Sequence, residues 1–176
     1  MEAEIRKEME EDFSQVFNLI ELAFKNKKYS DHQEQFLVQK LRDSDVFEPE
    51  LSLVAEFNKE IVGYILLTKI KIKNGIDEHL ALALAPVAVL PAYQKRGIGA
   101  QLIRTAHSRT ATLGYGAVIV LGHENYYPKF GYQPAEKYGI QLPFDVPKEN
   151  CMVKELRTNA LKGVHGMVEY AKEFYS

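Results

Sequence analysis

Apolar positions in the first forty residues recur at the spacing of helices. An amphipathic helix is predicted over residues 13 to 25 by a stripe that comprises Val16, Phe17, Leu19, Ile20, Ala23 and Phe24. Asp31 and Glu34 have the spacing of a capping box, so a second helix is expected to begin there. Its inward face is expected to carry Phe36, Leu37 and Leu41. The chain is therefore predicted to start with two helices.

From residue 51 the pattern becomes that of strands. Residues 51–57 and 61–68 are apolar runs on either side of Asn58-Lys59, which predicts a hairpin. Ile70 and Ile72 then alternate with lysines until Asn74-Gly75, where another turn is expected. Residues 79–90 are almost entirely apolar, as is typical of a strand buried on both faces. This order predicts an antiparallel meander that leads into the middle of a sheet.

A parallel unit is predicted next. Residues 99–113 have a helical pattern that ends at Gly114, and residues 117–121 form another apolar run. Strand, helix and strand in this order indicate a parallel βαβ unit with a right-handed crossover. The expected fold class is α/β, with a mixed, twisted sheet flanked by helices. A chain of 176 residues fits a single domain, on which residues 136–176 are expected to pack.

Composition and charge narrow the class of protein. Hydrophobic residues make up 46% and charged residues 26% of the chain, which is typical of a globular protein. A formal net charge of −2 gives no general attraction to nucleic acid. With Cys151 as the single cysteine and scattered histidines, neither a disulfide framework nor a metal site is expected. The acidic N-terminus and the short apolar runs predict a soluble cytoplasmic protein without a membrane partner.

An anion site is predicted between the buried strand and the βαβ helix. Gly97 and Gly99 lie at this junction, where backbone N–H groups and the helix dipole favour a phosphate group. A dinucleotide-binding fingerprint would need a third glycine in place of Leu102 and an acidic residue about 20 positions later, and both are missing. A P-loop would need a Gly-Lys-Ser/Thr triplet, which the chain lacks.

A third phosphate-binding pattern is present. Gln94-Lys-Arg-Gly97-Ile-Gly99 matches Gln/Arg-x-x-Gly-x-Gly/Ala, and the chain thereby resembles the Gcn5-related N-acetyltransferase (GNAT) superfamily, in which this motif binds the pyrophosphate of coenzyme A. Val87-Ala-Val89 with Pro91, and Tyr127-x-x-x-Gly-Tyr132, stand in the matching places of two further family motifs. Residues 84–89 and 121–131 resemble the YhbS-like bacterial branch. The resemblance covers about residues 3–135 and, more loosely, the tail.

The resemblance implies the GNAT fold and a site for acetyl-CoA. Pro86 has no N–H group and should interrupt strand pairing, and the pantetheine arm of the cofactor is implied to pair with the strand backbone there. A backbone N–H of the same strand would stabilise the oxyanion formed during transfer. Lys95 and Arg96 add positive charge to the loop. The residues expected to bind the cofactor are Val87, Ala88, Val89, Gln94, Lys95, Arg96, Gly97, Ile98, Gly99, Ala100 and Asn125.

The resemblance also implies how a proton is delivered. Tyr127 stands where the family places the general acid that protonates the departing thiolate, and Tyr126 is the alternative. The strand glutamate that serves as a base in some members is replaced by Ala83. His123, Glu124 and Glu56 are the candidate bases, and an acceptor that arrives partly deprotonated would need none.

The implied reaction is direct transfer of an acetyl group from acetyl-CoA to an amine in a ternary complex. The alternative is a catalytically silent module that binds or senses acyl-CoA. The acceptor, a small molecule or a peptide amine, is left open, and residues 24–35 are expected to form one wall of its pocket. Family members are often dimers, which makes a homodimer an open expectation for this chain.

Overall fold

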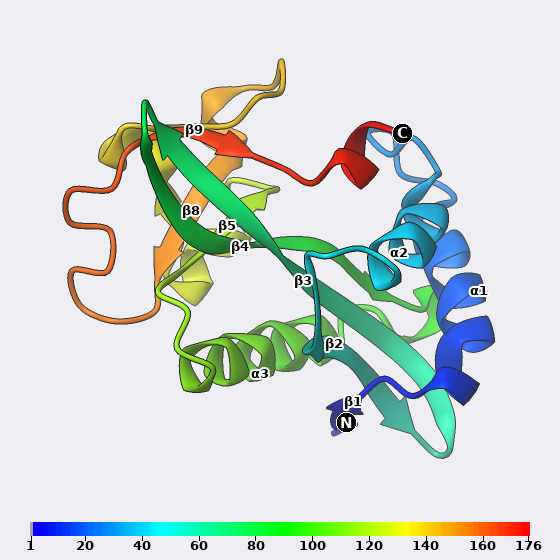
Figure 1. Ribbon diagram of the computed structural model, residues 1–176. Helices are drawn as coiled ribbons and strands as arrows, with labels where there is room; N and C mark the ends of the chain where they lie inside the picture. The colour runs from blue at the N-terminus through cyan, green and yellow to red at the C-terminus, as the bar shows by residue number, and fades with distance from the viewer. Residues whose placement is uncertain (1) are drawn as a thin grey trace. The chain divides into compact units, whose positions relative to one another are not determined.

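Two long strands, β3 (Glu60–Asn74) and β4 (Asp77–Val89), organise the fold in the computed structural model, which describes residues 2–176 (Figure 1). The chain divides into two compact units, and β3 and β4 contribute residues to both. The first unit contains the chain up to Leu67 together with Ala85–Arg109. The second contains Thr68–Leu84 together with Thr110–Ser176.

The strands of the first unit form the predicted antiparallel arrangement. β1 (Glu4–Lys7) pairs antiparallel with β2 (Phe47–Phe57), in a register that runs from Glu4↔Glu56 to Lys7↔Leu53. β2 and β3 are neighbours in the sheet. The turn between them contains Asn58 and Lys59 with φ values of 50° and 65°, so the hairpin predicted at this dipeptide is confirmed.

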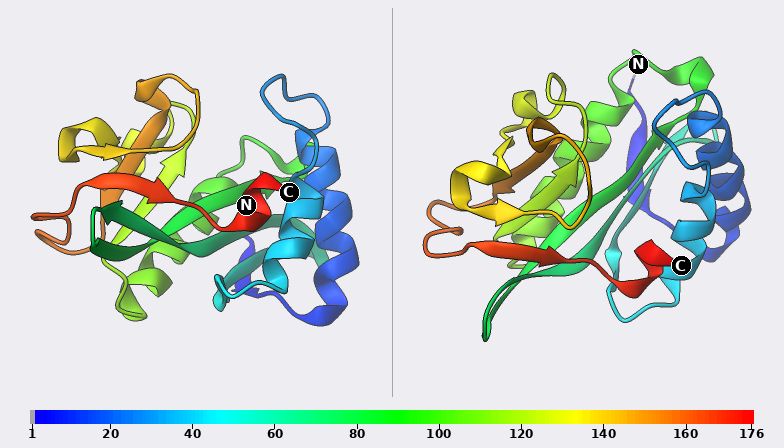
Figure 2. Two further views of the ribbon diagram at one scale, coloured as in Figure 1. Left: turned by 45° about the horizontal axis from the view of Figure 1, so that its top comes forward. Right: turned by 90° about the horizontal axis from the view of Figure 1, so that it is seen from above.

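Three helices cover the strands of the first unit. α1 (Phe13–Phe24) and α2 (Glu34–Arg42) lie side by side on one face, and α3 (Ile98–Thr112), which begins in this unit, lies on the opposite face (Figures 1 and 2). α1 and α3 confirm the predicted helices to within one residue at each end. The core between the layers includes Val16, Leu19 and Ile20 of α1, Leu53 of β2, Tyr64 of β3, and Ile98 and Leu102 of α3.

The start of α2 differs from the expected capping box. The helix is present, but the Ser30 hydroxyl hydrogen-bonds the Glu34 carboxylate, while Asp31 accepts a hydrogen bond from the Gln33 N–H at 2.9 Å. The predicted inward face is also wrong in part, because Phe36 is 40% exposed and packs on the Phe17 ring instead. The buried positions of α2 are Gln35, Val38 and Leu41. Leu41 is therefore buried as predicted and Leu37 is half-buried, whereas Phe36 is not on the buried face.

The second unit contains the parallel pair of the sheet. Leu82–Leu84 of β4 pair parallel with Val118–Val120 of β5 (Ala117–Leu121), which confirms the predicted parallel strands. β8 (Cys151–Glu155) runs antiparallel to β5 and carries β6 (Gln133–Pro134) on its other edge. β9 (Gly166–Glu169) pairs antiparallel with β3 and parallel with β7 (Ile140–Gln141). The mixed α/β sheet is therefore confirmed.

The C-terminal tail belongs to the second unit. Its buried residues Ile140, Val153 and Val168 share one apolar core with Ile70 of β3 and Ile119 of β5. Tyr170 is also part of this core, and the partly buried Phe144 packs against it with the two ring centroids 4.9 Å apart. The tail therefore adds strands and core residues to the sheet.

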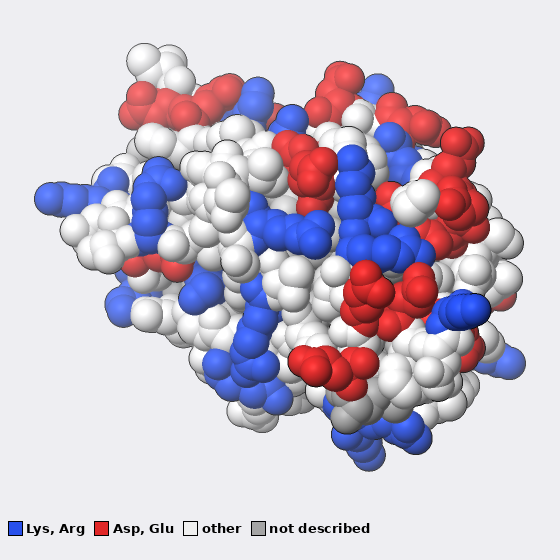
Figure 3. All heavy atoms as spheres, turned by 90° about the horizontal axis from the view of Figure 1, so that it is seen from below, with Lys and Arg blue, Asp and Glu red and all other residues white. Residues whose placement is uncertain are grey.

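Surface charge is mixed. Basic and acidic side chains are interspersed on the face drawn in Figure 3. Within residues 2–176, no helix combines the length and the apolar character that crossing a membrane requires.

Candidate active site

The loop between β4 and α3 is held by its own backbone and by Gln94. After β4, the Leu90 N–H donates to the Val62 carbonyl at 2.9 Å, and a short 3₁₀ helix, η2 (Pro91–Tyr93), follows. The Gln94 side chain turns back, so that its Nε2 donates to the Val89 carbonyl at 3.0 Å. Gln94 therefore fixes the loop to the end of β4, a role that the predicted cofactor contact did not include.

Gly97 and the first turn of α3 form an anion-binding arrangement. Gly97 has a φ of 86°, a backbone conformation that residues with a side chain rarely adopt. Its carbonyl accepts a hydrogen bond from the Gln101 N–H at 3.0 Å. The N–H groups of Ile98, Gly99 and Ala100 precede the first helical bond and are directed outward from the helix end. No acidic residue stands in this first turn. The helix end can therefore accept a negatively charged group.

The basic residues of the loop between β4 and α3 are exposed at the protein surface. Lys95 and Arg96 are both exposed, and Lys95 has a φ of 63°. The Arg96 guanidinium lies 5.6 Å from the centre of the Tyr93 ring, whose hydroxyl donates to Glu60 at 3.2 Å. These cations add to the positive field at the start of α3.

Pairing between β4 and β5 stops where Pro86 was expected to interrupt it. The last paired residues are Leu84 and Val120, and the following Ala85-Pro86 peptide bond is cis. Beyond it, β4 continues through Val87, Ala88 and Val89 in the first unit. Ala88 is buried, whereas Val87 and Val89 are half-buried.

Tyr127 is fixed among aromatic rings of the second unit. It begins the 3₁₀ helix η3 (Tyr127–Phe130), is 8% exposed, and contacts the rings of Tyr126 and Tyr132 edge-on at 5.1 Å and 5.5 Å between centroids. Burial, with a smaller contribution from Tyr126, raises the pKa of Tyr127 above its usual range. Within residues 2–176, its hydroxyl has no hydrogen-bond partner. Tyr127 is thus a buried phenol in an aromatic environment that disfavours its ionised form.

Tyr126, the alternative acid, has a different environment. It is half-buried, and the ammonium group of Lys129 lies 4.2 Å from the centre of its ring. Of the two tyrosines, Tyr127 is therefore the one more fully enclosed by protein.

The candidate bases are not brought together. His123 and Glu124 are exposed, as is Asn125, whose N–H donates to the His123 Nδ1 at 3.1 Å. The carboxylate of Glu56 is held by Arg6, with Nη2 2.8 Å from Oε1. Ala83 lies in the core of the second unit at 2% exposure.

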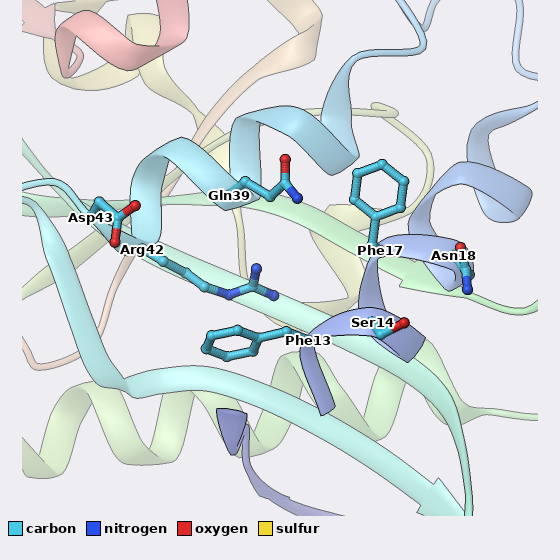
Figure 4. Close-up of a pocket in the computed structure, with 7 residues that line it drawn as sticks. All are labelled: Phe13, Ser14, Phe17, Asn18, Gln39, Arg42 and Asp43. Atoms are coloured by element: carbon cyan, nitrogen blue, oxygen red, sulfur yellow. The ribbon is translucent and has the colours of Figure 1, made fainter. Parts of the chain in front are cut away.

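Two hollows flank the helices of the first unit. The larger has a volume of about 590 Å³ and opens between α1 and α2, where the Arg42 guanidinium stacks over the Phe13 ring at 3.9 Å (Figure 4). The smaller has about 180 Å³ and lies where α1 ends and α2 begins. Its lining includes Phe24, His32 and Gln35, which fall in the segment expected to form a wall of the acceptor pocket.

Sequence reasoning missed two sets of residues. The first set is Gly122, which leaves space for the Tyr127 ring, and Asn150, which hydrogen-bonds to it. The second is the buried ion pair of Glu8 and Arg42. The only local signal for Gly122 is a glycine directly after a strand. Glu8 and Arg42 are 34 residues apart and give no local signal.

Comparison with known proteins identifies the family. A model described as "Acetyltransferase (GNAT) domain" matches residues 48–134. An uncharacterized N-acetyltransferase of Escherichia coli K12, YjhQ, is 40% identical over 119 residues, which span 67% of this chain and 66% of that relative. Both matches confirm the resemblance read from the motifs.

Two crystal structures have the same fold. The GNAT family N-acetyltransferase YhbS from Escherichia coli, in complex with CoA, superposes with a TM-score of 0.89 at 26% identity, over 100% of this chain and 93% of that one. A GNAT family acetyltransferase from Brucella melitensis, in complex with acetyl-CoA, gives a TM-score of 0.81 at 29% identity, with 98% and 97% of the two chains covered.

Proposed function

Because the chain belongs to the Gcn5-related N-acetyltransferase family, we propose that it transfers the acetyl group of acetyl-CoA directly to an amine in a ternary complex. The observation that carries this proposal is the start of α3, where a left-handed Gly97 and a first turn without carboxylates offer N–H groups to an anion. A diphosphate fits this arrangement better than a neutral ligand does.

The chain's own groups would hold the cofactor at three places. The N–H groups of residues 98–100 bind the diphosphate, with Lys95 and Arg96 adding charge. The backbone of Val87, Ala88 and Val89 pairs with the pantetheine arm, and Asn125 adds a polar contact. Gln94 would act indirectly, by holding the loop in place, because its side-chain amide hydrogen-bonds to the Val89 carbonyl. Bound acetyl-CoA supplies the thioester carbon that the amine attacks.

Tyr127 is the proposed general acid. A phenol is protonated at neutral pH, and the Tyr127 hydroxyl has no hydrogen-bond partner within residues 2–176, so it can donate its proton to the departing thiolate. His123 and Glu124 are the remaining candidates for a base. An acceptor that arrives partly as the neutral amine would react without either.

The test is release of the coenzyme A thiol from acetyl-CoA in the presence of pooled polyamines, aminoglycosides, amino acids or short lysine peptides. Turnover that depends on one pool supports the proposal, and dividing that pool identifies the acceptor. Tyr127→Phe is expected to lower kcat at least about 100-fold and to leave the acetyl-CoA dissociation constant unchanged. Tyr126→Phe is the matched control, and a loss confined to that variant would move the acid to Tyr126.

A silent acyl-CoA-binding module is the competing function, and the alanine at position 83 favours it. In that case acetyl-CoA raises the melting temperature, yet no pool supports thiol release. If acetyl-CoA neither stabilises the protein nor reacts, both functions fail.

A further inference from the structure

The position of Tyr127 depends on a neighbouring residue that has no side chain. A Cβ atom built on Gly122 would lie 2.8 Å from Cδ2 of Tyr127 and closer still to Cε2. These atoms belong to a rigid ring, which cannot bend away as the end of a lysine could. The φ angle of Gly122 lies outside the positive range, so its backbone is open to any residue. Glycine is therefore needed here for space alone.

The backbone of Gly122 is itself fixed on both sides by one residue. Its N–H donates to the Asn150 carbonyl at 2.9 Å, and the Asn150 side-chain Nδ2 donates to the Gly122 carbonyl at 3.0 Å. These bonds continue the β5–β8 ladder, whose last pair is Leu121↔Cys151. Asn150 therefore determines where the surface behind the Tyr127 ring lies.

Three aromatic neighbours also pack against the Tyr127 ring. Tyr126, Phe130 and Tyr132 contact Tyr127 with centroid distances of 5.1, 6.5 and 5.5 Å. The Tyr127 N–H donates to the His123 carbonyl at 3.3 Å, which anchors the start of η3 to the turn after Gly122. Because the backbone is anchored and these rings are in contact with it, we expect the space at Gly122 to determine how deeply the Tyr127 ring enters.

We propose that Gly122 and Asn150 are positioning residues for proton delivery, because together they form the seat that places the Tyr127 hydroxyl. This inference rests on the proposed role of Tyr127 as general acid. A displacement of about 1 Å in a reacting group can reduce a rate roughly 100-fold. A single methyl group added at Gly122 should therefore lower kcat.

The decisive variant is Gly122→Ala. We expect kcat for thiol release, with the amine pool that the parent chain uses, to fall roughly 10- to 100-fold while the KM for acetyl-CoA stays unchanged. Gly116→Ala is the matched control at the other end of β5. The atoms nearest to a Cβ there belong to the flexible Arg157 side chain and to Ala160, at 3.1–3.2 Å, so kcat should be kept.

A double-mutant cycle separates positioning from a general loss of structure. In the Tyr127→Phe background, Gly122→Ala should cause no further loss of kcat, because the hydroxyl that it displaces is already gone. Losses that multiply would overturn the proposal, and so would a Gly122→Ala variant with the kcat of the parent. If Tyr127→Phe itself keeps full turnover, Tyr127 is not the general acid, and Gly122 and Asn150 do not position one. Acetyl transfer by the parent chain would not be contradicted by that result.

Two further measurements keep the test independent of folding and of the acceptor. If Gly122→Ala does not fold, Asn150→Asp removes the Nδ2 donor without changing shape, and it should lower kcat by a smaller factor at an unchanged acetyl-CoA dissociation constant. A crystal structure of Gly122→Ala soaked with CoA should show a displaced Tyr127 ring. An unmoved ring would overturn the proposal whatever the turnover.

Discussion

Arg42, the last residue of α2, binds the buried carboxylate of Glu8 through two hydrogen bonds, Nη2 to Oε2 at 2.6 Å and Nε to Oε1 at 3.1 Å. The Ser52 hydroxyl donates to the same carboxylate at 2.8 Å and lies 2.7 Å from the Tyr64 hydroxyl. The Glu8 side chain is 1% exposed and that of Arg42 is 10% exposed. This cluster joins α2 and the segment after β1 to β2 and β3.

Removing one partner of this pair should destabilise the protein strongly. Arg42→Met leaves the Glu8 carboxylate buried without its cation, and the free energy of unfolding should fall by about 3–5 kcal/mol. Urea denaturation measures the change. Lys7→Met is the control, since Lys7 and Glu50 form a half-exposed pair at 3.1 Å whose loss should cost no more than about 1 kcal/mol. Equal effects of the two substitutions would contradict the importance given to burial.

Gly97→Ala should weaken cofactor binding through the backbone. No atom lies within 4 Å of the added Cβ, so the cost comes from a φ of 86° and amounts to about 1 kcal/mol. Relief of this strain turns the first N–H groups of α3 away from the anion, and the acetyl-CoA affinity should fall about fivefold, the factor that corresponds to 1 kcal/mol. Isothermal titration calorimetry measures it.

Gly75→Ala provides the comparison for Gly97. Gly75 has a φ of 62° in the β3–β4 turn and equally open surroundings, so its replacement should lower stability by a similar amount. Its acetyl-CoA affinity should equal that of the parent. A similar loss of affinity in both variants would mean that global stability, rather than the α3 turn, is responsible.

The pH profile of kcat should lack a falling limb caused by Tyr127 below pH 10. Burial raises the pKa of this phenol, so the protonated form that donates persists beyond the value of about 10 for an exposed tyrosine. Measurements between pH 7 and pH 10 test this. A decline within this range would contradict a general acid with the raised pKa of Tyr127.

The same raised pKa values set an alkaline limit to stability. Burial also raises the pKa of Tyr64 and Tyr170, so these phenols ionise in the unfolded chain near pH 10 and in the folded chain only above it. Their contribution is complete below pH 10 and is lost as the pH rises through the folded pKa values. Activity should therefore be compared below that limit.

The sequence pattern correctly predicted the features that depend on interactions between residues close together in the chain. The Asn58-Lys59 turn, the length of α3 and the parallel pair β4–β5 follow from backbone preferences and from hydrophobic periodicity, and all three were predicted. The predicted capping box at the start of α2 was wrong because the side chains of Ser30 and Asp31 form competing hydrogen bonds. The spacing of residues alone does not show which of these hydrogen bonds forms. Phe36 is exposed because Phe17 provides a partner on the outer side of the helices.

Contacts between distant segments escaped prediction. The bond between Gly122 and Asn150 spans 28 residues, and no periodicity links the two positions. In the candidate site, the motif located the turn of Gly97 and the phenol of Tyr127. The burial of Tyr127, and the Gln94 amide bonded to the Val89 carbonyl, depend on packing that only the folded chain shows.

The seat of Tyr127 also bears on how this kind of protein changes during evolution. An alanine at position 122 and a smaller apolar side chain at position 127 would together fill nearly the same volume, so the exchange would preserve packing. The turn of Gly97 belongs to the other compact unit of the chain and would keep its sequence. By this route, two substitutions would be enough to turn an acetyltransferase that uses the Tyr127 phenol into an acyl-CoA receptor of the same fold.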